Sequence, residues 1–316
     1  MTQNGLFDLV VRHRVATVII FLIVFPWLMP YEALAVNVLI FGLYAVGFNL
    51  LFGYTGLLSF GHAAFLGSGS YVTGIVMVHY GWPWYAAIPA GVAFAALAGL
   101  SIGWLAIRTR GIYFSMVTLA LAQCVYYIFY KAEKLTGGEN GLRGVKVDKI
   151  DLFGMPLDFL NPTTKYYVIL AFVAAALWFV SRLLASPFGA VIETLRENET
   201  RAAACGYDVA RTKLLAFVLS AAICGLAGSL RALHLSIVSI DALHYLTSGQ
   251  VVMMSLLGGM GTFFGPFVGA AAFLLIEDVF TNLTKYWQLV VGVVFIVFVL
   301  FFPRGIWGSL LHWTGR

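Results

Sequence analysis

Residues 186–213 read SPFGAVIETLRENETRAAACGYDVARTK, a charged stretch between two long apolar runs, here named the central charged segment. Ser186 and Pro187 are typical of a helix start, because serine can accept hydrogen bonds from free backbone N–H groups and proline tolerates the first helical position. We predict a short helix from there to about Asn198. Gly206 then allows the chain to turn before the next apolar run.

Charged residues are spaced to support this short helix. Glu193 and Arg196 (i, i+3), and Glu197 and Arg201 (i, i+4), can pair along one helix face with the acid on the N-terminal side. Each such pair contributes only about 0.2–0.5 kcal/mol. Apolar residues between the charges form a small second face, so the predicted helix is amphipathic and needs a surface to pack against.

The composition is that of a membrane protein. Hydrophobic residues make up 61% of the 316 residues and charged residues 10%, against about 45–50% and about 25% in soluble domains. The net charge of +5 comes without a basic run or interleaved aromatic residues, which argues against nucleic-acid binding. The three cysteines lack CxxC spacing and indicate neither a disulfide framework nor a metal site.

Long apolar runs predict an all-α polytopic integral membrane protein with a single domain over residues 1–316. We expect about ten transmembrane helices and one short cytoplasmic helix. The predicted spans lie at residues 15–30, 34–52, 63–80, 84–107, 111–131, 165–184, 214–233, 248–262, 264–280 and 287–302. The first run also fits a secretory signal, but the many spans that follow favour a first transmembrane helix.

The distribution of Lys and Arg predicts the orientation. With the N-terminus inside, more of these residues fall on the inner side than on the outer side, as the positive-inside rule requires. Both termini and the central charged segment are then cytoplasmic. The loop at residues 132–164 is extracytoplasmic.

Two glycine clusters lie within apolar runs, in NLLFGYTGLLSFGHAAFLGSGS (residues 49–70) and SLLGGMGTFFGPFVGAA (residues 255–271). Small residues allow helices to pack closely in lipid. The alternative hypothesis is that broken or re-entrant helices line a substrate path, where polar side chains satisfy freed backbone groups. The candidate path residues are Asn49, Gly53, Gly56, Ser59, Gly61, His62, Gly258, Gly259 and Gly261. Both clusters occupy corresponding places between an inward and an outward span, which suggests an internal repeat.

The outer loop contains TGGENGLRG, from Thr136 to Gly144. It lacks GK[ST] and a strand-loop-helix context, so it is no nucleotide-binding loop. It is either a set of surface turns or a docking surface for a soluble partner. Because no Walker-type sequence occurs in the chain, ATP in an energised system would be handled by another chain.

Six segments carry a resemblance to a known family. They are GFNLLFGYTGLLSFGHAAFLGSGSYVTGI, TRGIYFSMVTLALAQ, TGGENGLRG, SPFGAVIETLRENETRAAACGYDVARTKLLAFVLSAAICGLAGSL, SLLGGMGTFFGPFVGA and FFPRGIWG. In this order they resemble the LivM-type permeases of bacterial branched-chain amino acid ABC importers, over most of the chain. The central charged segment is the most specific of the six.

The resemblance implies a permease subunit that forms the passage together with a second, LivH-type permease chain. A periplasmic amino-acid-binding protein would deliver leucine, isoleucine or valine, and two ATPase subunits would use ATP and Mg²⁺ on the inner face. This chain itself would be no enzyme, would hold no cofactor or metal, and would lie in the lipid of the bacterial inner membrane.

The resemblance also implies that the central charged segment is a coupling helix with its turn, seated in a groove of an ATPase subunit. The implied coupling residues are Glu193, Arg196, Glu197, Asn198, Glu199, Arg201, Ala202 and Gly206. Importer permeases more broadly show a Glu-Ala-Ala…Gly signature here. In this chain Arg201 stands before the two alanines, and the acid is displaced to Glu199.

Other functions stay open at this point. Permeases of importers for urea, short amides or other amino acids look similar. A secondary transporter would more often bury ionisable residues at mid-membrane, whereas most charges here fall at predicted span ends. A membrane-embedded enzyme is disfavoured, because the six histidines are scattered without HExxH spacing or paired boxes. His234, Asp241 and His244 fit interfacial positions better than a metal site.

Overall fold

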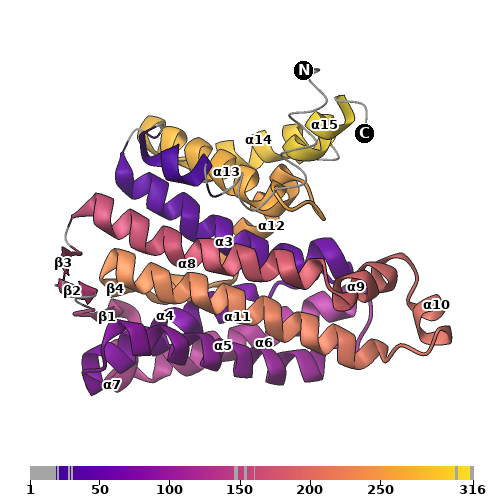
Figure 1. Cartoon of the computed structure of the whole chain (residues 1–316), viewed down its shortest axis with the longest axis horizontal. Coiled ribbons are helices and arrows are strands. Elements are labelled where there is room, and N and C mark those ends of the chain that lie inside the picture. The colour runs from indigo at the N-terminus through magenta and orange to yellow at the C-terminus, as the bar shows by residue number, and fades with distance from the viewer. Residues whose placement is uncertain are drawn as a thin grey trace.

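The structure, a computed structural model, describes residues 19, 21–27, 29, 31–145, 149–152, 155–159, 161–302 and 305–313. Most of this chain is helical (Figure 1). The long helices are α3 (Glu32–Thr55), α4 (His62–Tyr80), α5 (Trp84–Ala106), α6 (Ile112–Lys131), α8 (Pro162–Leu184), α11 (Val209–Leu235), α12 (Tyr245–Gly258), α13 (Gly265–Leu283) and α14 (Trp287–Phe301). The short ones are η1 (Phe25–Trp27), α7 (Glu133–Thr136), η2 (Gly138–Asn140), α9 (Pro187–Glu197), α10 (Glu199–Ala204), η3 (Ile240–Leu243) and α15 (Gly305–Trp313).

Seven helices in the described residues are long and apolar enough to cross a membrane. They are α3, α5, α6, α8, α11, α13 and the stretch Trp287–Ser309, which begins with α14. Each corresponds to a span expected from the sequence. The chain is therefore a multi-pass membrane protein in which apolar run length placed the helices correctly.

The other three expected spans are not among these seven helices. Residues 63–80 do form α4, but this helix carries Ser, Thr and Gly along a buried face and is not among the seven. The expected span at 248–262 forms only the 14-residue α12, about 21 Å at 1.5 Å per residue, which is shorter than a bilayer core of about 30 Å. Of the expected span at 15–30, the structure describes residues 19, 21–27 and 29, and the rest lies outside the described residues.

The helix α3 occupies the centre of the bundle. Its side chains are buried on all sides, and it packs against α8, α11, α12 and α13. A helix that is apolar all round has no face suited to water and is stable when other helices surround it. On the other side of α11, the helices α4 and α5 complete the core. Phe48, Phe65 and Phe217 are fully buried where α3, α4 and α11 meet.

Small residues allow α4 and α11 to cross at very short range. A Cβ atom added at Gly69 would overlap the Gly225 carbonyl, and one added at Gly228 would overlap the Leu66 carbonyl oxygen. The Ser70 hydroxyl donates to the Gly228 carbonyl at 2.7 Å. Close packing of small residues, the first of the two hypotheses for the glycine-rich stretch, is thus what the structure has at Gly69.

The two long polar connections lie at opposite ends of the bundle (Figure 1). One end carries α7 with the strands β1 (Leu142–Arg143), β2 (Lys149–Leu152), β3 (Met155–Asp158) and β4 (Ile237–Val238). β1 pairs with β4 and β2 with β3, both antiparallel. The all-α expectation therefore missed two short ladders, because two to four residues are too few for a visible alternation of apolar residues. The other end carries α9 and α10.

Candidate functional site

The central charged segment folds into two short helices that rest on the bundle. The helix α9 buries Gly189, Ile192 and Leu195 and packs against α3, α8 and α11. The predicted short amphipathic helix is thus present. Its opposite face leaves Glu193 and Glu197 exposed to solvent.

The helix ends at Asn198, whose extended backbone (φ −159°, ψ 102°) separates α9 from α10. The Asn198 Oδ1 atom accepts a hydrogen bond from the Arg201 backbone N–H at 2.9 Å and so caps α10. The predicted Glu197–Arg201 pair is wrong, because the two residues do not share a helix. The predicted cap at Ser186 is wrong as well, because its hydroxyl donates to the Leu183 carbonyl at 2.6 Å.

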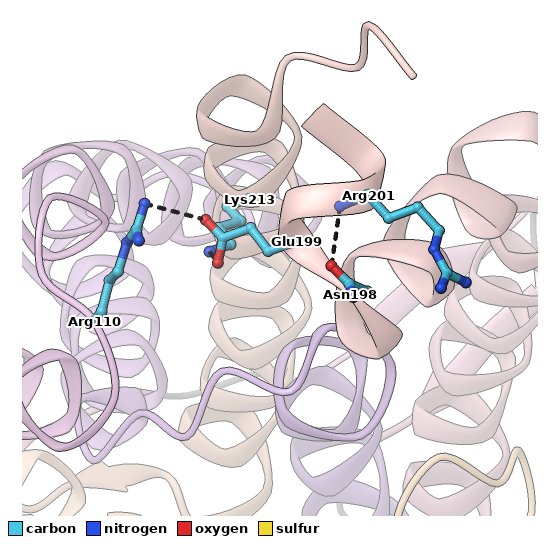
Figure 2. A network of polar contacts seen from close by, with 5 residues as sticks. All are labelled: Arg110, Asn198, Glu199, Arg201 and Lys213. Atoms are coloured by element: carbon cyan, nitrogen blue, oxygen red, sulfur yellow. Dashed lines mark hydrogen bonds and ion pairs between the residues drawn. The ribbon is translucent and has the colours of Figure 1, made fainter. Parts of the chain in front are cut away.

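Glu199 ties α10 to the neighbouring helices (Figure 2). Its carboxylate lies 2.8 Å from Lys213 Nζ on α11 and 3.9 Å from the Arg110 guanidinium between α5 and α6. The Lys213 side chain is 11% exposed and that of Arg110 is 87% exposed. The short, mostly buried pair therefore carries more energy than the long exposed one. Ala202, on the inner face of α10, is fully buried.

Arg201 is free to meet a partner. Its side chain points away from Glu199 in Figure 2, is exposed, and makes no ion pair within the described residues. Glu193 and Glu197 are likewise exposed and unpaired in that part of the chain. Gly206 follows in the left-handed region (φ 88°), where a side chain would be strained, so the predicted turn is present.

Arg196 reaches from α9 to two other elements. Its Nη1 atom donates to the Gly53 carbonyl in the last turn of α3 at 2.5 Å. A Cβ atom added at Gly261, in the turn between α12 and α13, would lie 2.6 Å from the same nitrogen. The predicted Glu193–Arg196 pair is therefore wrong, because the guanidinium turns inward to a backbone acceptor. A cleft of about 410 Å³ opens beside it, lined by Tyr54, Glu193, Arg196, Glu197 and Gly261.

Asn49 holds α3 to the α12–α13 turn. Its Nδ2 atom donates to the Thr262 carbonyl, and its Oδ1 atom accepts from the Gly261 N–H, both at 3.0 Å. Gly53 lies so close to the turn that an added Cβ would be 2.6 Å from the Gly261 nitrogen. The two glycine clusters, more than two hundred residues apart, thus meet at the end of the bundle that carries α9. The sequence analysis did not predict this contact between the two clusters.

The remaining candidate path residues occupy turns and the packed interior. Gly56, Gly259 and Gly261 have positive φ angles (76°, 111° and 70°), so they permit the turns after α3 and α12. Gly258 packs against Gly265 on α13, where an added Cβ would overlap a carbonyl. Their suggested role in lining a path stays a prediction.

His62 begins α4 inside the core. Its Nε2 atom lies 2.9 Å from the Ser220 hydroxyl of α11, which donates to the Gly47 carbonyl at 2.6 Å. The Ser59 hydroxyl accepts from the Gly61 N–H at 3.2 Å. The sequence argument missed Ser220, although a serine within the apolar run at 214–233 was a usable signal.

Potential metal ligands do not gather in the described residues: no three His, Cys, Asp or Glu side chains there are close enough to hold an ion. The His244 ring lies against the Tyr126 and Tyr245 rings.

Comparison with known proteins decides the family. The family described as "Branched-chain amino acid transport system / permease component" matches residues 31–299. The chain belongs to this family. This permease is 29% identical over 294 residues to the high-affinity branched-chain amino acid transport system permease protein LivM of Escherichia coli (86% of this chain, 69% of that protein). It is 28% identical to LivM of Salmonella typhimurium, with the same coverage.

More distant relatives extend the comparison. A probable branched-chain amino acid transport permease protein LivM of Methanocaldococcus jannaschii is 25% identical over 82% of this chain and 84% of its own length. The autoinducer 2 import system permease protein LsrC of Klebsiella pneumoniae is 27% identical over 62% of this chain and 56% of its own length. No solved structure matches this permease. The resemblance noted in the sequence is confirmed.

Proposed function

We propose that this permease is the membrane subunit of an ATP-driven importer that carries leucine, isoleucine and valine. Family membership and the similarity to LivM proteins support the solute class. The observation that carries the coupling mechanism is the α9–α10 unit. Its exposed charges face solvent, while Arg196 and Glu199 bind it to the bundle. A unit with these contacts can transmit a movement of a bound partner to the helices of the bundle.

The partners follow from this proposal. A second, LivH-type permease chain completes the passage, and two ATPase subunits bind the α9–α10 surface and use ATP and Mg²⁺. This chain carries no ATPase site and needs no cofactor of its own. A periplasmic binding protein delivers the amino acid at the end of the bundle that carries α7 and the β1–β4 ladder.

We place the chain in the bacterial inner membrane with both termini and α9–α10 in the cytoplasm. In this arrangement α4, the short α12 with its turn, and an N-terminal span bring the total to about ten. Basic residues around α9–α10 support this orientation.

The contacts of α9 and α10 suggest how motion reaches the path. Arg196 binds the end of α3 and touches the α12–α13 turn, while Glu199 binds α11. A shift of α9 and α10 as one rigid unit therefore moves the inner ends of several core helices together. The path then opens where Asn49 and Gly53 now meet Gly261, with Ser59 and His62 behind them.

A different solute is the second candidate. Similarity to the autoinducer 2 import system permease protein LsrC supports a solute other than a branched-chain amino acid as this alternative. Urea, short amides and other amino acids belong to this alternative as well.

The test is a mild-detergent pull-down of the tagged chain from its native membrane, followed by mass spectrometry. We expect ATPase chains, a second permease and an amino-acid-binding protein, whose ligand identifies the solute. A chain recovered alone that still transports in liposomes without ATP would contradict the proposal and favour a secondary transporter.

A further inference from the structure

A cavity of about 370 Å³ lies between α3, α11, α12 and α13. It is lined by Tyr31 before α3, Arg231 near the end of α11, and Glu277 in the second half of α13. These positions are at the end of the bundle opposite α9 and α10, which is the outer end in the orientation proposed above. Its volume lies within the range of small-molecule sites, about 300–1,000 Å³.

The cavity holds opposite charges that are not neutralised by each other. The Arg231 guanidinium makes no ion pair and no hydrogen bond within the described residues. It lies 5.6 Å from the Phe41 ring, and the Asp241 carboxylate acts on it only at longer range than an ion pair. The Glu277 carboxylate forms no ion pair in that part of the chain either. Both side chains are half-buried. A half-buried charge without a partner of opposite charge is energetically costly. We therefore expect a ligand to pair with these two side chains.

The Asp278 carboxylate, unlike that of Glu277, has a hydrogen-bond partner within the described residues. It accepts a hydrogen bond from the Tyr31 hydroxyl and so joins the beginning of α3 to the end of α13 at the rim of the cavity. This hydrogen bond, with desolvation and the carboxylate charge, raises the pKa of the Tyr31 phenol to about 12. The phenol therefore remains a donor at physiological pH. Asp278 therefore holds α3 and α13 together, and Glu277 is the carboxylate of the cavity that has no ion pair in the described residues.

Apolar side chains form one part of the remaining lining, and the polar residues Asn37, Gln250, Thr281 and Asn282 form the other. Leu34 and Phe41 come from α3, Met254 from α12 and Leu274 from α13. All four are aliphatic or aromatic groups suited to a branched hydrocarbon side chain. An opposite pair of charges next to an apolar wall is the complement of an amino acid, whose ammonium and carboxylate groups are joined at the carbon that bears the side chain.

We propose that this cavity binds the amino acid on its way into the membrane, with Arg231 holding the α-carboxylate, Glu277 the α-ammonium group and the apolar wall the side chain. The proposal rests on the proposed function and adds a binding site within the permease itself. Arginine suits the role because its planar fork matches a carboxylate. Discrimination would then operate in the membrane as well as in the binding protein.

The test measures binding of radiolabelled leucine to the complete importer without its binding protein. The complex is placed in nanodiscs of phosphatidylglycerol, so that no ethanolamine headgroup can occupy the same charges. Leucinamide, which lacks the carboxylate, and 4-methylpentanoate, which lacks the ammonium group, serve as competitors. Wild type should prefer leucine to both by about 10- to 100-fold, because each lost charged hydrogen bond weakens binding by that order.

We expect the two cavity variants to change selectivity in opposite ways against the two competitors. Arg231→Gln should bind leucine about tenfold or more weakly and lose its preference over leucinamide, while it still rejects 4-methylpentanoate. Glu277→Gln should lose its preference over 4-methylpentanoate and still reject leucinamide. Misfolding cannot produce opposite selectivities in two variants. Arg143→Gln, an exposed arginine outside the cavity, is the matched control and should bind as wild type does.

The outcomes separate this inference from the proposed function. If wild type retains its ATPase subunits and takes up leucine, but both cavity variants bind and select as wild type does, the cavity assignment is wrong and the proposed function stands. If wild type neither retains ATPase subunits nor takes up branched-chain amino acids, the proposed function fails first. A crossed change in selectivity in a complex that still retains its ATPases supports both.

Discussion

Single side chains of α9 and α10 find their partners on other helices. The pairs expected from local spacing, Glu193 with Arg196 and Glu197 with Arg201, do not form. Arg196 binds a backbone carbonyl of α3 instead, and Glu199 binds Lys213 of α11. Local spacing is a weak guide here because a pair on a helix surface contributes only about 0.2–0.5 kcal/mol, less than a charged hydrogen bond at a partly buried site.

The Glu199–Lys213 pair should matter more than the Glu199–Arg110 pair. We expect Glu199→Gln to lower the free energy of unfolding by about 1–2 kcal/mol, because it leaves the mostly buried lysine without its counter-charge. Arg110→Gln should change it by less than about 0.5 kcal/mol, because that contact is long and exposed. Thermal unfolding of both purified variants in one detergent measures the difference. Equal effects would contradict the assignment.

Arg201 should act on a partner and not on the fold. We expect Arg201→Glu to reach the membrane at wild-type level with an unchanged unfolding temperature, since its side chain makes no ion pair within the described residues. Its affinity for the ATPase should fall about tenfold or more, because a reversed charge repels acidic groups in a complementary groove. Co-purification measured against Arg143→Glu, at the opposite end, is the check. Wild-type ATPase recovery in Arg201→Glu would remove this residue from the coupling surface.

At the scale of elements, helix packing depends on where glycine allows close approach. The crossing of α4 and α11 has carbonyl groups where a side chain at Gly69 or Gly228 would lie. In contrast, a Cβ atom added at Gly249 on α12 would meet nothing within 4 Å. The sequence shows glycines of both kinds without distinguishing them, because the difference lies in the opposing helix.

The same substitution at two glycines should therefore have opposite effects. Gly228→Ala should destabilise the permease by about 1–3 kcal/mol, because the added carbon collides with backbone atoms that cannot change rotamer. Gly249→Ala should stabilise it by up to about 1 kcal/mol, because alanine has the higher helix propensity and open space around it. Unfolding midpoints in the same detergent compare them. Similar shifts in the two variants would refute the packing argument.

At the scale of the whole molecule, α3 with the α12–α13 pair has a different contact at each end. At the end that the proposed orientation places inside, Asn49, Arg196 and the Gly261 turn are in contact. At the other end the same helices border the charged cavity around Arg231 and Glu277. In the proposed orientation, contact at the inner end and a cavity at the outer end fit a permease that receives its solute from outside.

The orientation can be tested with Cys205, which is exposed at the end of α10. In a background of Cys124→Ala and Cys224→Ala, a membrane-impermeant maleimide should label Cys205 only after the cells are permeabilised. In a Cys205→Ala version, Glu139→Cys in the outer loop should be labelled in intact spheroplasts. Labelling of Cys205 in intact cells would reverse the proposed topology.

Much of the architecture follows from the sequence alone. Apolar run length and composition determined that the chain is a helical membrane protein and located seven of its helices, since crossing a hydrocarbon layer imposes a minimum length. Residue order was sufficient to indicate the family as well. The short helix was predicted to end at about Asn198, and α9 ends at Glu197 with Asn198 next to it.

Only the tertiary structure decided which side chains work together. The contacts of Asn49 with the Gly261 turn, of Arg196 with Gly53, and the cavity around Arg231 and Glu277 all join residues far apart in the chain. Helix length and hydropathy depend on neighbours in sequence and can be judged from it. A hydrogen bond or a cavity depends on how helices are arranged against one another, and that arrangement is set by the packing of the whole bundle.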